Sequence, residues 1–75
     1  MKLNNRAVDN AKPREKKWKL ADGHGLHLLV HPNGGKYWRF KYRLDGKEQE
    51  MALGVYPEVS LKQARQRHQA ARLYL

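Results

Sequence analysis

From residue 25 to residue 53, apolar and polar side chains alternate with a period of two, which is the pattern of β-strands. This pattern predicts three strands, at residues 25–31, 36–44 and about 47–53. Strong turn signals separate them. The first is PNGG at residues 32–35, and the second is Asp45-Gly46, a dipeptide typical of a two-residue hairpin turn. The middle of the chain is therefore predicted to form a three-stranded antiparallel meander.

The alternation gives the two faces of this sheet opposite chemistry. One face carries large apolar and aromatic residues that we expect to form the core: Leu26, Leu28, Val30, Trp38, Phe40, Tyr42, Met51 and Leu53. The other face carries mostly cations and imidazoles. Its residues are Tyr37, Arg39, Lys41 and Arg43 on the second strand, and His27, Leu29 and His31 on the first. Glu48 and Glu50 should share this second face, where they can pair with Arg43 and Lys41 across the hairpin.

Residues 60–75 have the spacing of an amphipathic helix. Ser60 can be its N-cap and Gln63 can complete a capping box. One stripe of the helix collects Leu61, Ala64, His68, Ala71 and Leu75, and we interpret Tyr74 as a packing residue as well. Because a meander of this size needs one face covered, the helix should pack on the apolar face of the sheet. The opposite face then stays open.

The first quarter of the chain has weaker signals. A short helix is expected over residues 4–10, capped by Asn4 or Asn5. Residues 12–19 are predicted to be a basic extended segment in which Trp18 folds back onto the body, and residues 21–25 have turn composition. The fold class is therefore α+β: a three-stranded antiparallel β-sheet packed on one face by a C-terminal α-helix, with a short N-terminal helix and a basic extended segment.

Length and composition limit the class of protein. The 75 residues are enough for one domain, residues 1–75, with a thin core. There is no cysteine, no apolar run long enough to span a membrane and no apolar signal segment. We therefore expect a cytoplasmic protein. Neither paired carboxylates nor a metal-ligand spacing is present, so we predict no catalytic residues, metal or cofactor.

Charge points to the partner. The chain carries 16 Lys and Arg against 7 Asp and Glu, and residues 1–47 hold twelve of these cations and only four acids. Concentrated positive charge of this kind is typical of a nucleic-acid-binding domain. A two- or three-stranded sheet fits the major groove of DNA, where arginine can bind guanine and both cations can bind phosphate. The candidate DNA-binding residues are Arg39, Lys41, Arg43, Tyr37, Lys36, His27 and His31 of the sheet, and Lys12, Arg14, Lys16, Lys17 and Lys19 of the basic segment.

Three ordered motifs connect these features to a known family. They are D-G-x-G-L-x-L-x-V from Asp22, K-x-W-x-x-x-Y-R from Lys36, and L-G-x-Y-P-x-x-S-L-x-x-A-R from Leu53. In order and spacing the chain resembles the N-terminal domain of P4-like prophage integrases, which are tyrosine recombinases. Among the matched residues, Gly54 and Pro57 fit backbone requirements, whereas Lys36, Arg43 and Arg65 fit DNA contacts. Arg39 and Lys41 fall where the motifs are open, as expected of residues that choose a sequence.

The resemblance implies an arm-type DNA-binding domain, a fragment of a larger integrase without its core-binding and catalytic domains. Such a domain would bind double-stranded DNA at arm-type sites during site-specific integration and recombination at the bacterial nucleoid. Other integrase subunits or a directionality factor are further partners that it implies, with no membrane or small-molecule substrate. Three alternatives remain at this point: a protein-interaction module, an RNA-binding domain, which Tyr37 as the lone exposed aromatic of the open face disfavours, and a self-contained enzyme.

Overall fold

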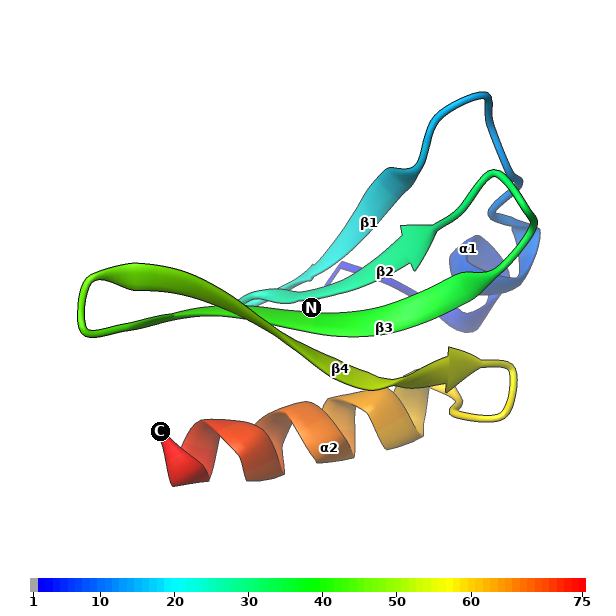
Figure 1. Ribbon diagram of the computed structural model, residues 1–75. Coiled ribbons are helices and arrows are strands. Elements are labelled where there is room, and N and C mark those ends of the chain that lie inside the picture. The colour runs from blue at the N-terminus through cyan, green and yellow to red at the C-terminus, as the bar shows by residue number, and fades with distance from the viewer. Residues whose placement is uncertain (1) are drawn as a thin grey trace.

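The computed structural model describes residues 2–75, which form a four-stranded antiparallel sheet and two helices (Figure 1). The elements in chain order are α1 (Asn5–Asn10), β1 (Trp18–Gly23), β2 (Leu26–Val30), β3 (Lys36–Leu44), β4 (Lys47–Tyr56) and α2 (Leu61–Tyr74). The strands lie in the order β1-β2-β3-β4, so each pairs with its neighbours in the chain. The α+β class is confirmed. No helix within this range is long and apolar enough to cross a membrane.

The prediction of three strands was wrong, because β1 occupies the end of the expected basic arm and most of the expected turn. Trp18–Gly23 pairs with β2, and the turn is confined to His24 and Gly25. The register shifts between Ala21 and Gly23, so Asp22 is the extra residue of a β-bulge. An Asp-Gly pair normally signals a loop. Here it is tolerated in a strand because the Asp22 carboxylate is paired inside the protein, as described below.

Strand β4 is also longer than predicted, since it runs to Tyr56 and the third strand was expected to end at about residue 53. A second register shift makes this possible. Trp38 pairs with Gly54 while its neighbour Arg39 pairs with Ala52, which leaves Leu53 as the extra residue. Gly54 has φ +130°, and a Cβ there would overlap the Val59 side chain. The backbone requirement predicted at Gly54 is therefore confirmed, and its physical cause is the close return of the chain toward α2.

The core lies between the sheet and α2, which runs beside β4 (Figure 1). Trp38 is completely buried, and its indole Nε1 donates a hydrogen bond of 2.7 Å to the Val59 carbonyl oxygen. The His68 ring packs edge-on against the Phe40 ring, with 4.6 Å between the ring centroids. This contact explains why a histidine lies in the apolar stripe of the helix. The other core residues predicted on β2 and β3 are also buried: Leu26, Leu28, Val30 and Phe40. Tyr42 is the exception, because it is only partly buried at the margin of the core.

Both ends of α2 test the helix prediction. At the start, the Ser60–Gln63 capping box is present as expected. The stripe is buried only as far as Ala71. Leu75 is half exposed and Tyr74 is 92% exposed, so the packing roles predicted for them were wrong. The reason is that the β3–β4 hairpin bends away from the end of α2 (Figure 1).

The short helix α1 covers the other end of the same sheet face. Asn4 is its N-cap, since its Oδ1 accepts a hydrogen bond from the Ala7 amide at 2.8 Å. Val8 is completely buried. The Lys36 ammonium donates to the carbonyl oxygens of Val8 and Asp9 at 2.8 and 2.9 Å. Lysine at the C-terminal end of a helix is favourable because the free carbonyls and the helix dipole are negative there.

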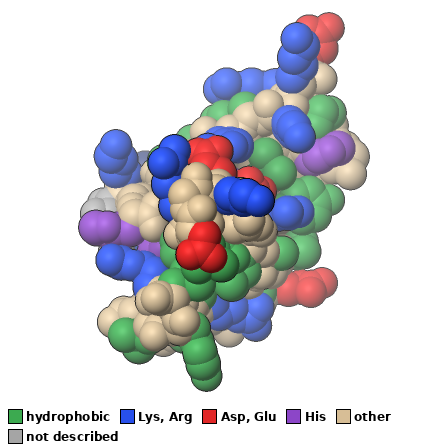
Figure 2. Space-filling view, turned by 60° about the vertical axis from the view of Figure 1, so that its left-hand side comes forward, with side chains coloured by type: hydrophobic (Ala, Val, Ile, Leu, Met, Phe, Trp, Pro, Cys, Tyr) green, Lys and Arg blue, Asp and Glu red, His purple; other side chains and the backbone are tan. Residues whose placement is uncertain are grey.

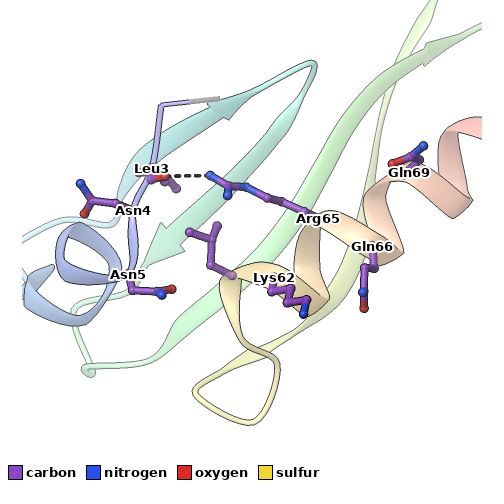
Figure 3. A pocket seen from close by; sticks show the side chains of 8 residues that line it. Leu3, Asn4, Asn5, Lys62, Arg65, Gln66 and Gln69 are labelled. Carbon is purple, nitrogen blue, oxygen red and sulfur yellow. Dashed lines mark hydrogen bonds between the residues drawn. The ribbon is translucent and has the colours of Figure 1, made fainter.

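An ion pair with a buried carboxylate joins β1, α2 and the N-terminal segment. Arg65 contacts the Asp22 carboxylate with two donors, Nε to Oδ2 and Nη2 to Oδ1, both at 2.9 Å. The same carboxylate accepts from the Leu3 amide at 3.0 Å, and Arg65 Nη2 also donates to the Leu3 carbonyl at 2.7 Å (Figure 3). Asp22 is only 2% exposed. The Arg65 guanidinium and the Leu3 amide outweigh this burial and lower the pKa of Asp22 below its ordinary 3.8.

This ion pair should govern stability. Replacing Arg65 by Met strands a buried carboxylate, so we expect Arg65→Met to lower the free energy of unfolding by about 3 kcal/mol, measured by urea denaturation at pH 7. The matched control is Lys62→Met, one turn earlier on α2 and exposed, which should change it by less than about 0.5 kcal/mol. Equal stability of the two variants would contradict the role of Arg65.

The same pair sets a pH dependence of known sign. Because the pKa of Asp22 is lower in the folded state, the pair contributes fully at neutral pH, and this contribution is lost as the pH falls below 3.8 through the lowered pKa. The wild-type chain should therefore lose stability over this range more steeply than Arg65→Met. Parallel pH profiles for the two proteins would contradict the assignment.

Candidate nucleic-acid interface

The face of the sheet opposite α1 and α2 carries the predicted cations, and we call it the open face. The strand registers arrange its side chains in cross-strand rows. From one end of the sheet to the hairpin tip, the rows are Lys19–Leu29–Tyr37–Val55, Ala21–His27–Arg39–Ala52, Lys41–Glu50 and Arg43–Glu48. Arg39, Lys41 and Arg43 thus form one line along β3, as the period of two predicted. We refer to these three residues as the cation row.

Two glutamates of β4 lie beside the cation row. The register places Glu48 opposite Arg43 and Glu50 opposite Lys41, as predicted. The ion pairs run diagonally instead. Arg39 Nη1 is 3.7 Å from Glu50 Oε1, and Lys41 Nζ is 3.3 Å from Glu48 Oε1. Within residues 2–75 the structure shows no ion pair for Arg43.

These pairs leave the cations accessible. All four side chains are between 34% and 58% exposed. Exposed ion pairs contribute between zero and about 1 kcal/mol, because water and salt screen them and because ordering long side chains costs entropy. An incoming anion can therefore exchange with either glutamate. Figure 2 shows one side of the molecule, on which lysine and arginine side chains surround a few acidic ones.

His27 does not lie on the surface of the open face as predicted, because it is only 5% exposed. The prediction placed β2 at the edge of the sheet. With β1 present, β2 is an inner strand, and His27 is flanked by Ala21 and Arg39. Burial lowers the pKa of His27 below 6.5, so the ring is neutral at pH 7. If Nδ1, which lies 3.2 Å from the Gly25 carbonyl oxygen, carries the proton, Nε2 is left as an acceptor.

The open face also holds buried polar atoms without partners. Among the described residues, three buried side-chain atoms have no hydrogen-bond partner, and all three belong to this face: His27 Nε2, His31 Nδ1 and Arg39 Nε. Unpaired buried polar atoms are rare in folded proteins and are costly. His31 packs edge-on against Tyr37, with ring centroids 6.2 Å apart, and both of these predicted site residues are half-buried on this face.

Two other candidate residues lie elsewhere. Lys36 follows the parity of Trp38, on the face covered by the helices, where its ammonium is bound to α1. Arg65 is bound to Asp22 and Leu3. Neither side chain contributes to the open face. Lys36 and Arg65 belong to two of the sequence motifs, in which core residues lie close to them. In the structure, both side chains bind groups of the protein itself.

The basic segment leads directly into β1. Arg14 stacks on the Trp18 ring, with its guanidinium carbon 3.6 Å from the ring centroid, and Trp18 Nε1 donates to the Lys12 carbonyl at 2.9 Å. These contacts hold the segment against the start of β1, with Lys12, Lys16 and Lys17 exposed. Lys19, within β1, joins the open face. The alternation of Trp18, Leu20 and Asp22 with Lys19 and Ala21 could have indicated this strand, but the high local charge masked it.

Comparison with known proteins shows which family the chain resembles. A family model described as an arm DNA-binding domain matches residues 3–75, almost all of the chain. The integrase of Enterobacteria phage P4 is 52% identical over 77 residues, covering 100% of this chain and 18% of that protein. The prophage integrase IntZ of Escherichia coli K12 is 54% identical over 67 residues, covering 87% of this chain and 17% of that protein.

A less similar relative is matched over a comparable part of its length. The integrase of Shigella phage Sf6 is 43% identical over 65 residues, covering 87% of this chain and 17% of that protein. The chain thus spans less than a fifth of the length of each of these integrases.

Proposed function

The chain belongs to the family of arm DNA-binding domains, and from this premise we propose that it binds double-stranded DNA sequence-selectively through the open face of its sheet. The observation that carries the proposal is the cation row on the one broad face that neither helix covers. It matches a polyanionic partner, and the net charge of +9 supports the same partner.

The dimensions of the sheet fit the major groove. Neighbouring strands lie about 4.8 Å apart, so two or three of them span about the 12 Å width of that groove in B-DNA. Strand β3 is an inner strand, and its cation row would lie toward the groove floor. Arg39, Lys41 and Arg43 would then reach base edges. We assign Tyr37 and His31 to supporting this row rather than to direct contact, because both are half-buried and their rings pack edge-on against each other.

In this proposal, one edge of the sheet binds the DNA phosphates. Lys19 and the basic segment lie along β1, the edge strand on the opposite side from β4. With the sheet in the groove, this edge would face one DNA backbone. Lys12, Arg14, Lys16 and Lys17 would meet its phosphates, which adds affinity but little sequence information. Lys36 and Arg65 have structural roles in this proposal.

The wider role follows the relatives. Since the matched relatives are phage and prophage integrases, we infer that this chain serves as the arm-type DNA-binding domain of an integrase, holding accessory sites while other domains carry out strand exchange. In this proposal, other integrase subunits and a directionality factor are its neighbours in the complex. A protein-interaction module with a merely basic surface is the competing function, and the following experiments separate the two.

The first experiment tests selectivity. Duplexes selected from a random pool by the wild-type chain are measured by fluorescence anisotropy against scrambled duplexes near physiological salt. Arg39→Ala should weaken binding to the selected duplex by about 1–3 kcal/mol and relax the preference at one base pair. The matched control, Lys62→Ala on α2, should leave both unchanged. Equal weakening on selected and scrambled duplexes would exclude a base-reading role for Arg39.

The second experiment tests the phosphate contacts. Lys16→Ala should reduce the slope of log affinity against log salt by about 0.9, because one fewer counterion is released on binding. It should leave the ranking of duplexes intact. An unchanged slope would show that Lys16 stays in solvent. If the wild-type chain itself binds all duplexes equally and releases them at moderate salt, the protein-interaction function becomes the better account.

A further inference from the structure

The open face presents acceptors as well as donors, and they are placed in pairs. Arg39 and Glu50 lie side by side with 3.7 Å between Nη1 and Oε1, and Lys41 and Glu48 repeat the arrangement with 3.3 Å between Nζ and Oε1. Each pair therefore shows a donor group on β3 next to an acceptor group on β4. On a surface that only attracts phosphate, two carboxylates beside the cation row would be a disadvantage.

The pairs contribute little to holding the fold. Their side chains are at least one-third exposed, so each pair is worth no more than a surface salt bridge. The hairpin register is already determined by the Asp45-Gly46 turn and by the contacts of Phe40 and Met51 with the core. The positions of the two glutamates thus call for an explanation in the binding function.

Arg39 is held in place for recognition. Its guanidinium carbon lies 5.9 Å from the centroid of the Tyr37 ring, and its Nη1 lies 3.7 Å from Glu50 Oε1. Its Nε is buried, so the donors available to a partner are those of the two Nη groups. A side chain ordered in this way loses less entropy when it binds a planar partner.

The matching partner is a G·C base pair. In the major groove, guanine presents two acceptors, N7 and O6, and the adjoining cytosine presents the N4 amino donor. We propose that the Arg39–Glu50 pair reads one G·C base pair as a unit, with the Arg39 guanidinium on guanine and the Glu50 carboxylate accepting from the cytosine N4 amino group. Glu50 is then a specificity-determining residue of the interface. This inference rests on the proposed DNA-binding function.

The Arg39–Glu50 pair would distinguish G·C from other base pairs by repulsion as well as by attraction. With A·T at this position, the carboxylate would face the O4 acceptor and the methyl group of thymine instead of an amino donor. With the base pair reversed to C·G, Arg39 would face the amino group and Glu50 the guanine acceptors. In both cases a charged group meets the wrong partner, which is how interfaces reject competing ligands.

The test uses the full 75-residue chain in three forms: wild type, Glu50→Ala and Glu50→Gln. Each selects from a pool of random duplexes, and affinities are then measured on the wild-type-selected duplex and on single base-pair variants of it. The wild type should favour G·C at one position by roughly tenfold. Glu50→Ala should lose most of that preference while binding the other duplexes as well as or better than the wild type. Glu50→Gln, which keeps an acceptor oxygen, should retain part of it.

A modified base shows which atom is read. Replacing the cytosine at that position by a 2-pyrimidinone base, which lacks the N4 amino group, should weaken the wild type several-fold and leave Glu50→Ala unaffected. Glu58→Ala, an exposed glutamate in the connection before α2, is the matched charge control and should behave as wild type toward both bases.

Each contrary outcome is distinct. If Glu50→Ala keeps the G·C preference, or if the missing amino group weakens both proteins equally, the reading by Glu50 is wrong although the proposed DNA-binding function stands. If Glu50→Ala loses affinity equally for all duplexes and unfolds at lower urea, Glu50 is structural and the inference fails. If the wild type shows no sequence preference at all, selective DNA binding itself fails and this inference fails with it.

Discussion

The ion pair between Asp22 and Arg65 is the constraint on which the arrangement of this domain depends. It joins the bulge of β1, the middle of α2 and the N-terminal segment at Leu3 through hydrogen bonds of 2.7 to 3.0 Å. Because these contacts lie on the core side, they hold α2 and the segment leading into α1 over one face of a four-stranded sheet. A domain of 75 residues has little core with which to achieve this otherwise. The opposite face is left free for a partner.

The division between the faces explains the mixed chemistry of β3. Trp38 and Phe40 point into the core, and Arg39, Lys41 and Arg43 point away from it. A single strand therefore links stability and recognition, since packing of the rings fixes the height and spacing of the cations. The unpaired buried atoms of His27, His31 and Arg39 also lie on the open face, beside the cation row.

The sequence predicted those features that depend on local periodicity. The alternation in β3, the Asp45-Gly46 turn and the Ser60 capping box are all present. The alternation in β1 was masked by the high local charge, and the sequence gives no local sign that the Asp22 carboxylate is buried against Arg65, 43 residues away. The same missing strand made His27 seem exposed. Lys36 and Arg65 were selected as DNA contacts for their charge, and only tertiary structure shows that each is bound to backbone carbonyls or to a carboxylate. Tyr74 was assigned to packing because local periodicity cannot show where the sheet bends away from a helix.

In the proposed function, the open face of the sheet meets DNA and the side covered by the helices does not. Backbone amide NMR of the chain titrated with a selected duplex tests it most directly. We expect the largest shift changes at residues 37–43 of β3 and 48–52 of β4, with further changes along residues 12–19 and little change over residues 61–72 of α2. Changes concentrated on α2, with β3 unaffected, would contradict the account.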